Sequence, residues 1–261
     1  MEILFLMLTG VMSGFIGGLL GLGGGILLMP VLRFALGIPT MEAAGISIFG
    51  VFFVTISGSY RHYKLGHIHL PSLMPVIITG AFSSLFFSLA FMKMVGHTEW
   101  IDFAVGIVFL IVAVRMIRAG LRKRMGREGF SKGNNRLPGT VLQKGLIGTL
   151  AGAIPGFLGI GTGAILVPAF SFTLKAPIKV AIGSSLACFA INALMSTVMK
   201  WDQGFIDFSV ALPISLGAVL GATIGSTVNK HIPSSALKFI FGVTFLYASS
   251  KFIFSSWGIT I

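Results

Sequence analysis

The chain reads Gly17-Gly18-Leu19-Leu20-Gly21-Leu22-Gly23-Gly24-Gly25, and Pro30 follows five residues later. This glycine run lies inside an apolar block that extends from Ile3 to Leu36. A straight helix over that block would be about 50 Å long, whereas the hydrocarbon layer of a membrane is about 30 Å thick and needs about 20 residues. Because glycine disfavours a continuous helix, the block is predicted to break at the glycine run.

A second long apolar block, Lys144–Leu174, contains a related run, Gly156-Phe157-Leu158-Gly159-Ile160-Gly161-Thr162-Gly163, which Pro168 follows. Sliding the sequence by 138 residues superimposes the two runs and their flanks. The matched pairs are Gly10/Gly148, Gly14/Gly152, Gly18/Gly156, Gly21/Gly159, Gly23/Gly161, Gly25/Gly163, Pro30/Pro168, Pro39/Pro177, Gly45/Gly183 and Ser47/Ser185. Shared apolar composition alone would not align that many glycines and prolines. The sequence therefore contains an internal duplication.

The composition is that of a membrane protein. Hydrophobic residues make up 55% of the 261 residues and charged residues 10%, whereas soluble domains carry about 25% charged residues. The further apolar blocks are Ala43–Ser59, Leu70–Met94, Ile101–Ile117, Val180–Met199, Ile206–Val228 and Leu237–Phe254. We therefore expect an all-α polytopic fold, in which each repeat has a glycine-broken helix hairpin and three spanning helices, giving 8–10 transmembrane segments in total.

Charges predict the topology. Nine of the 19 Lys and Arg residues fall between Arg115 and Lys144, and the positive-inside rule makes that loop cytoplasmic. If the repeats are inverted, fifteen basic residues lie inside and four outside, namely Arg33, Lys93, Lys200 and Lys251. The expected organisation is a first repeat at 1–120, a basic cytoplasmic loop at 121–143 and a second repeat at 144–261. This concentration of charge in one loop also argues against a nucleic-acid partner, despite the net charge of +12.

Inverted repeats with interrupted helices at matching positions indicate a transporter's binding site. A helix that begins inside the membrane leaves backbone N–H groups without partners and concentrates partial positive charge at its N-terminus. Two such ends would bind an anion, with Gly23, Gly24, Gly25, Gly161, Thr162 and Gly163 donating from the backbone. The glycines at spacing four, such as Gly10, Gly14 and Gly18, are interpreted as helix-packing residues.

The following helix of each copy adds polar candidates. Ser47 aligns with Ser185, Ser184 lies beside it, and Asn192 lies two turns further on. A serine in a membrane helix commonly bonds back to its own helix, so a purely structural role stays open for each serine. Asn192 needs either a helix partner or a ligand, because an unpaired amide in the membrane is costly.

Other chemistries find little support in the sequence. His62, His67 and His69 lack acids or cysteines at metal-ligand spacing and are interpreted as solvated loop residues. Glu42 and Asp207 lie at the edges of apolar blocks. A nucleophile–base set, a phosphate-binding loop and a nucleotide-binding segment are not apparent in the sequence. No enzymatic activity, cofactor or metal is therefore expected, and transport would depend on an ion gradient or on the anion's own gradient.

The strings Gly14-x-x-Gly17-Gly18-Leu19-Leu20-Gly21-Leu22-Gly23-Gly24-Gly25 to Pro30 and Ala43-x-Gly45-Ile46-Ser47-Ile48 resemble the signature of the TauE/SafE sulfite exporter family, also called the toluene sulfonate uptake permease family. The second copy repeats it with Gly159-Ile160-Gly161-Thr162-Gly163 to Pro168 and Gly183-Ser184-Ser185-Leu186. The resemblance implies transport of sulfite, sulfonates and related sulfur anions across the bacterial inner membrane. Ile46 stands where the family has threonine, and Thr162 stands where it has glycine, so one hydroxyl group is lost and another gained relative to the family's pattern.

These observations predict a secondary transporter of a small sulfur-containing anion, sulfite or an organosulfonate, that works in the export direction. It would lie in the bacterial inner (plasma) membrane as a multi-pass protein, in contact with the lipid bilayer. The alternatives are a passive anion channel and a carrier of another small organic anion. A homodimer is left open.

Overall fold

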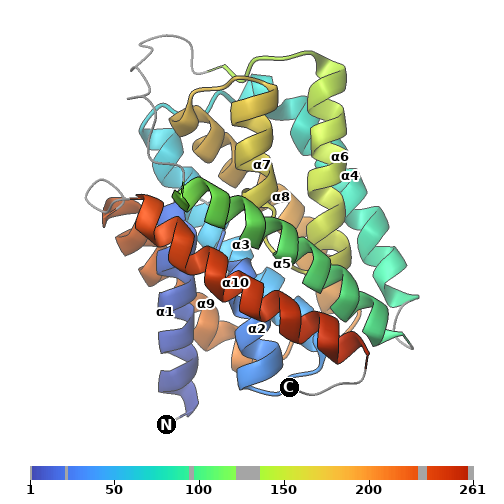
Figure 1. The fold of residues 1–261 in the computed structure, drawn as a ribbon. Coiled ribbons are helices and arrows are strands. Elements are labelled where there is room, and N and C mark those ends of the chain that lie inside the picture. Colours follow the sequence, from blue (N-terminus) through green and yellow to red (C-terminus); the bar gives the residue numbers. More distant parts are fainter. Residues whose placement is uncertain (1, 21–22, 94–96, 122–135, 229–233, 258–261) are drawn as a thin grey trace. The chain divides into compact units, whose positions relative to one another are not determined.

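The computed structural model describes residues 2–20, 23–93, 97–121, 136–228 and 234–257, and the regular secondary structure within these ranges is helical (Figure 1). Among the described helices, six are long and apolar enough to cross a membrane, and a shorter apolar stretch runs from Ile3 to Gly18. The prediction of an all-α polytopic membrane protein is therefore confirmed.

Ten α-helices and two short π-helical segments follow one another along the described residues. They are α1 (Glu2–Leu20), α2 (Gly25–Pro30), η1 (Val31–Ala35), α3 (Thr40–Lys64), α4 (Leu70–Met92), α5 (Thr98–Leu121), α6 (Val141–Leu158), α7 (Gly163–Pro168), η2 (Ala169–Thr173), α8 (Ile178–Asp202), α9 (Phe208–Val228) and α10 (Ser234–Ser256). The aligned prolines Pro39 and Pro177 immediately precede α3 and α8, where a fixed φ favours the start of a helix. Both long apolar blocks are divided at their glycine runs.

The chain forms two compact units, each of which contains helices from both predicted repeats. One unit holds α1 to α4 and α6 to α9, and the other holds α5 and α10. The segments 1–120, 121–143 and 144–261 are defined by the duplication and stay a prediction. Most of the predicted basic loop lies outside the described residues.

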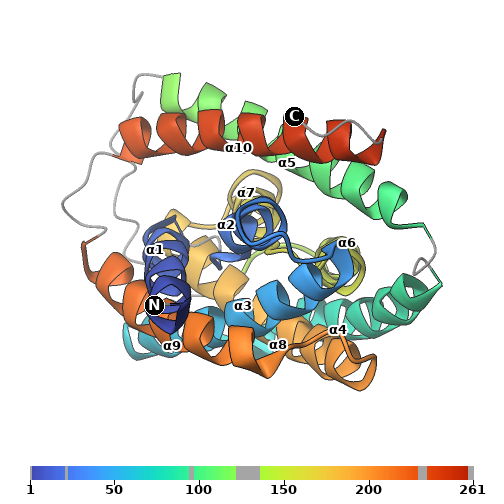
Figure 2. The same ribbon diagram turned by 90° about the horizontal axis from the view of Figure 1, so that it is seen from below.

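The larger unit is built from helix pairs that exchange between the two copies. Helix α1 packs along α9, and α6 packs along α4, while α3 and α8 pack against each other between them (Figure 2). Because the 138-residue offset relates α1 to α6 and α4 to α9, each outer pair is the counterpart of the other. The inverted orientation of the copies stays a prediction.

Closely packed glycines hold both pairs together. A Cβ atom built on Gly14 would collide with the Ala218 backbone of α9, and one on Gly152 would collide with the Gly80 backbone of α4. Gly10, Gly18, Gly148 and Gly156 make equivalent backbone approaches to α9 and α4. Small residues allow helices in a membrane to approach closely enough for extensive van der Waals contact. The interpretation of these glycines as packing residues is confirmed.

The smaller unit is a helix pair closed by aromatic packing. Phe109 of α5 stacks on Phe245 of α10 with a centroid distance of 6.0 Å, and Phe252 meets it edge-on at 5.5 Å. Ser249 donates a hydrogen bond to the Gly106 carbonyl at 2.8 Å, and the buried Asp102 accepts one from Ser255 at 3.0 Å. These contacts satisfy the polar groups between the two helices, as a lipid environment requires.

Candidate functional site

Both helix breaks occur where the glycine runs predict them. Helix α1 ends at Leu20, and α2 begins at Gly25 after Gly23 and Gly24, whose φ values are 77° and 76°. Helix α6 ends at Leu158, and Gly159 follows with φ 67°. Side chains rarely adopt such positive φ angles, so glycine is the residue suited to these three positions.

The first break reverses the chain along α1. A Cβ atom on Gly24 would lie 2.9 Å from the carbonyl oxygen of Ser13, and one on Gly17 would contact the Gly24 amide nitrogen. A continuous helix would separate residues 13 and 24 by about 16 Å. The ribbon shows the corresponding return, in which α1 ascends from the N-terminus and α2 descends beside it (Figure 1). The predicted hairpin is therefore present in the first copy.

The two breaks meet in the larger unit. A Cβ atom on Gly25, the first residue of α2, would lie 3.0 Å from the amide nitrogen of Gly161 and 3.5 Å from the Ser47 hydroxyl. Helices α2 and α7 lie one above the other in Figure 1 and overlap end-on in Figure 2. Both short helices therefore direct their N-terminal ends toward the same place.

Each short helix begins with backbone N–H groups that precede its first internal hydrogen bond. In α2 these bonds start with Leu27 and Leu28, which donate to the Gly24 carbonyl at 3.0 and 3.3 Å. In α7 they start with Ile165 and Leu166, which donate to the Thr162 carbonyl at 2.9 Å each. The N–H groups of Gly25 and Gly163 come before these donors and lack intrahelical acceptors. Such groups, together with the helix dipole, favour negative charge.

The predicted side chains divide into satisfied and unsatisfied groups. Ser47 donates to the Gly25 carbonyl at 3.2 Å, and Ser185 donates to the Ile182 carbonyl of its own helix at 2.9 Å. By contrast, Thr162, Ser184 and Asn192 are fully buried, and their side-chain polar atoms have no hydrogen-bond partner within the described structure. A buried polar atom without a partner costs about 1–3 kcal/mol. The unsatisfied groups therefore indicate positions where a ligand or water would bind.

The predicted residues do not all lie at one point. Gly25, Ser47 and Gly161 converge at the meeting of the breaks, and a Cβ atom on Gly23 would lie 2.7 Å from the Phe189 ring. The Asn192 amide instead lies against Gly80 of α4, whose added Cβ atom would be 2.7 Å from the amide oxygen. Asn192 therefore belongs to the interface between α8 and α4, to one side of the breaks.

A row of polar residues beside the second break was missed as a group by the sequence analysis. Ser84 donates to the Asn192 carbonyl at 2.9 Å, and Ser88 lies 3.4 Å from the Ser196 hydroxyl. One turn beyond Ser196, Lys200 is fully buried, although its charge was counted as an outer one in the topology analysis. The spacing of four between Asn192, Ser196 and Lys200, which puts them on one helix face, was the available signal.

The three histidines differ from the expectation of solvated loop residues. His62 and His67 are partly buried and bring their Nδ1 atoms within 3.2 Å, while the His69 ring accepts a hydrogen bond from the Ser72 N–H at the start of α4. Burial, followed by the nearby charge of Lys179, lowers the pKa of His67. A group of three or more metal-ligating side chains is absent among the described residues.

The acids at the block edges are accounted for locally. Glu42 is exposed in the first turn of α3. Asp207 is also exposed and accepts hydrogen bonds from the Ser209 hydroxyl at 2.6 Å and the Ser209 N–H at 2.9 Å. The Ser209 side chain, and after it the Ser209 backbone, lower the pKa of the Asp207 carboxyl. Both carboxyl side chains are therefore exposed, in agreement with their positions at the edges of the apolar blocks.

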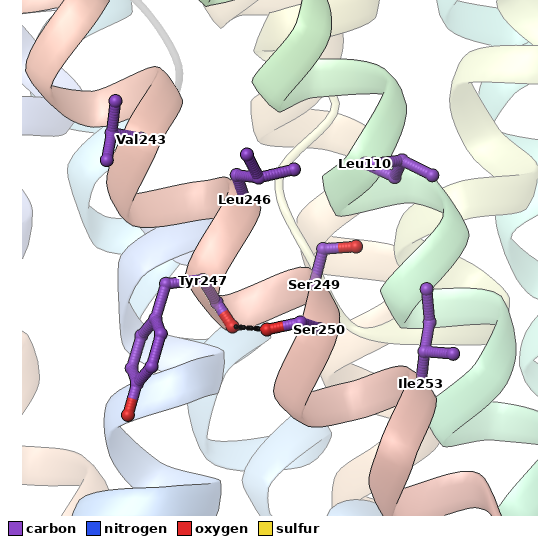
Figure 3. Close-up of a pocket in the computed structure, with 7 residues that line it drawn as sticks. All are labelled: Leu110, Val243, Leu246, Tyr247, Ser249, Ser250 and Ile253. Carbon is purple, nitrogen blue, oxygen red and sulfur yellow. Dashed lines mark hydrogen bonds between the residues drawn. The ribbon is translucent and has the colours of Figure 1, made fainter.

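A hollow of about 350 Å³ in the smaller unit is separate in character from the breaks (Figure 3). It is lined by Leu110, Val243, Leu246, Tyr247, Ser249, Ser250 and Ile253. Its two serines are satisfied, because Ser250 donates to the Tyr247 carbonyl and Ser249 to the Gly106 carbonyl, both at 2.8 Å. Its lining therefore lacks both the charge and the unpaired polar atoms found beside the second break.

Broken helices with paired N-terminal ends, set among apolar helices of membrane-spanning length, define a multi-pass membrane transporter. The profile of the family described as "Sulfite exporter TauE/SafE" matches residues 6–252 of the chain. The chain belongs to this family. Its substrates are therefore small molecules that it moves across a lipid bilayer.

Relatives along nearly the whole chain agree with this class. A probable membrane transporter protein of Xylella fastidiosa (strain 9a5c) is 26% identical over 252 residues, covering 95% of this chain and 94% of the relative. The probable membrane transporter protein YdhB of Bacillus subtilis (strain 168) is 24% identical, with coverages of 90% and 92%. The probable membrane transporter protein MJ0441 of Methanocaldococcus jannaschii is 27% identical, with coverages of 89% and 88%. No solved structure matches the chain.

Proposed function

We propose that the protein is a secondary carrier that exports a small sulfur-containing anion, sulfite or an organosulfonate, across the bacterial inner membrane. The central basic loop would face the cytoplasm. The family's description supports the choice of sulfite and of export. The chemistry of the breaks supports an anion, because N–H and O–H groups donate hydrogen bonds and sulfite oxygens accept them.

The observation that carries this proposal is the meeting of the two breaks at Gly25 and Gly161. Two helix N-terminal ends that point toward one place add their partial positive charges there. Beside them, the buried hydroxyl of Thr162 lacks a partner. An oxyanion between the short helices would satisfy this hydroxyl and the N–H groups of Gly25 and Gly163, which precede the first internal hydrogen bonds of their helices.

The opposed directions of α2 and α7 also support an inverted relation between the two copies. Two parallel copies would direct equivalent short helices the same way across the membrane. Here the equivalent residues Gly25 and Gly163 each begin a helix that leads away from the common centre. With the repeats inverted, the site would lie near the middle of the bilayer, where either face of the membrane can be opened to it.

The test uses purified protein in proteoliposomes and measures the uptake of radiolabelled sulfite against unlabelled sulfite inside. Thr162→Val removes the hydroxyl while keeping the side-chain shape, and Thr162→Ser restores it. A hydrogen bond to a charged group contributes about 1.5–3 kcal/mol, so the valine variant should lose transport by about tenfold or more. The serine variant should retain most of it.

Equal transport by the valine variant, at an equal folded fraction, would remove Thr162 from the site. If the wild-type protein is folded and carries neither sulfite nor an organosulfonate, the proposed cargo is wrong. Acceleration of tracer uptake by internal unlabelled anion identifies a carrier. A tracer uptake rate that does not change with the internal anion identifies a channel instead.

A further inference from the structure

Lys200 is a buried cation without a carboxylate partner in the described part of the chain. It lies in the last turn of α8 and is 0% exposed. Its Nζ atom donates a hydrogen bond to the Gly156 carbonyl at 3.0 Å and lies 3.5 Å from the centre of the Phe91 ring. Removing an ammonium from water costs several kcal/mol, and charged residues retained within membrane helices are commonly functional.

The oxygen that binds Lys200 belongs to the end of a broken helix. Gly156 lies in the last turn of α6, which ends at Leu158. The carbonyl groups of a final helical turn carry partial negative charge and lack intrahelical donors. Lys200 therefore binds the negative end of α6, while α7 begins at Gly163 with its positive end at the proposed anion site.

Hydroxyl and amide groups fix the surroundings of this cation. Ser88 also donates to the Gly156 carbonyl, at 3.3 Å, and Ser196 donates to the Pro155 carbonyl at 2.7 Å. Gln203 donates to the Ser88 carbonyl at 2.9 Å, and its own amide oxygen is buried without a partner. The carbonyl that holds the ammonium is thus itself fixed by a neighbouring hydroxyl group, within a buried polar part of the interface between α4, α6 and α8.

In transporters with interrupted helices, the N-terminal half-helix ends bind anionic groups and the C-terminal ends, with nearby carbonyls, bind the coupling cation. The same division exists at the second break, but here the cation is a side chain of the protein. We infer that Lys200 occupies the coupling-cation position and that the ion coupled to transport is the proton it carries. This inference rests on the proposed function, since it assumes that an anion binds between the breaks.

Most other charged groups on the packed elements are exposed, including Lys179 at the start of α8, whereas Lys144 of α6 is buried. Lys93, which caps the end of α4, is exposed, and so is Asp202 at the end of α8. Lys144 is at the opposite end of α6, and residues 163–168 of α7 include no ionisable side chain. Among the described residues, Lys200 is thus the ionisable group in direct contact with the broken end of α6.

The coupling step follows from charge. A proton that binds the neutral Lys200 amine forms the ammonium, which holds the Gly156 carbonyl and adds positive charge next to the break. This state favours the anion at Thr162 and Gly163. When the anion leaves on the other side, the ammonium releases its proton there, and the neutral amine returns empty. One proton therefore moves in the same direction as each anion, so an inward proton gradient drives uptake, and export follows when the outward gradient of the anion exceeds the inward gradient of the proton.

The test separates coupling from binding. Lys200→Met keeps much of the side-chain volume without a charge, and Lys200→Arg keeps a charge that does not lose its proton in proteins. Proteoliposomes are assayed for sulfite exchange at equal pH and for sulfite uptake with the outside acidic by about one pH unit. The matched control is Lys64→Met, because Lys64 is an exposed lysine at the end of α3.

We expect the pH gradient to accelerate uptake about tenfold in the wild type and in Lys64→Met. Lys200→Arg should still exchange sulfite, but the pH gradient should accelerate its sulfite uptake by less than twofold. Lys200→Met should also show less than twofold acceleration by the gradient. A full response in the arginine variant overturns the inference, as does transport by the wild type without any response. Loss of exchange in both variants also overturns it, because Lys200 would then serve binding or folding. Absence of sulfite and sulfonate exchange in the wild type removes the proposed function itself.

Discussion

In the first break, Ser47 donates to the Gly25 carbonyl and Thr55 donates to the Val51 carbonyl, so the hydroxyls there are satisfied by the protein. In the second break and along α8, the polar atoms of Thr162, Ser184 and Asn192 are buried without partners. The 138-residue offset gives their counterparts in the first copy as Gly24, Ile46 and Val54, which carry no polar side-chain atom. The two copies therefore share a scaffold, and at these three matched positions the second copy has buried polar groups, without partners in the described structure, where the first copy has none.

The two copies also differ at the C-terminal ends of the equivalent helices α3 and α8. Lys200 of α8 corresponds to His62 of α3 at the 138-residue offset. Lys200 binds the carbonyl at the end of α6, whereas the His62 ring faces His67 in the loop that follows α3. The proposed binding and coupling groups thus gather around the second break, while the first break would contribute mainly backbone groups.

The largest expected effect is on folding, and it concerns the closely packed glycines that the two copies share. Gly14→Ala and Gly152→Ala each place a methyl group against backbone, at Ala218 and at Gly80. Overpacking of this kind costs about 1–3 kcal/mol or more, so both variants should unfold at a lower temperature and yield less folded protein. The measurement is the monodisperse fraction on size exclusion, together with the midpoint of thermal unfolding.

The control for this pair is Gly145→Ala on α6. Its added Cβ atom would be 3.6 Å from a Thr79 methyl carbon, which is ordinary contact, so folding should be unaffected. If Gly152→Ala folded as well as Gly145→Ala, the close packing of α6 on α4 would not be a requirement of the fold.

A smaller effect should distinguish the copies. Asn192→Val gives the second copy the residue that the first has at Val54. Removing an unpaired buried amide should stabilise the fold by about 1–3 kcal/mol, while sulfite exchange should fall by about tenfold. Thermal unfolding and proteoliposome exchange measure the two quantities on one preparation.

A matched change in the first copy is Val54→Ala, which removes no polar group and should leave exchange within about twofold. If Asn192→Val is less stable than the wild type, the amide has a hydrogen-bond partner in the folded protein. Undiminished exchange would mean that the substrate does not depend on Asn192.

The smallest effect is a dependence on pH at the first copy's histidine pair. Burial, and then the charge of Lys179, lower the pKa of His67 below its ordinary value of 6.5. The neutral ring is therefore favoured in the folded state, and its contribution to stability is present above about pH 6.5 and is lost as acid protonates it. The midpoint of thermal unfolding should fall between about pH 7.5 and pH 5 by more in the wild type than in His67→Gln.

An equal fall in both proteins would show that His67 does not contribute to this dependence. His69→Gln serves as the comparison variant, because His69 lies in the same loop and caps the start of α4. At Lys200, by contrast, the proposed binding of a proton affects transport, whereas protonation of His67 affects the stability of the fold.

The sequence predicted much of the architecture because its signals are local. The length of the apolar blocks set the spanning helices, and the glycine runs set both breaks, since consecutive glycines and positive φ angles act within a few residues. The matched spacing of Gly10, Gly14 and Gly18 also predicted a packing face. The inverted orientation, the cytoplasmic loop and the bound anion stay predictions, since they concern a membrane and a ligand.

The sequence by itself determined that this is a duplicated helical membrane protein whose helices break at Gly23 to Gly25 and at Gly161 to Gly163. Only the tertiary structure decided which polar groups are satisfied, because a hydrogen-bond partner such as the Gly25 carbonyl for Ser47 is supplied by another segment of the chain. The same reason explains Lys200. Its sequence position suggests an outer charge, but the packing of α4 and α6 against α8 buries it on the carbonyl of Gly156.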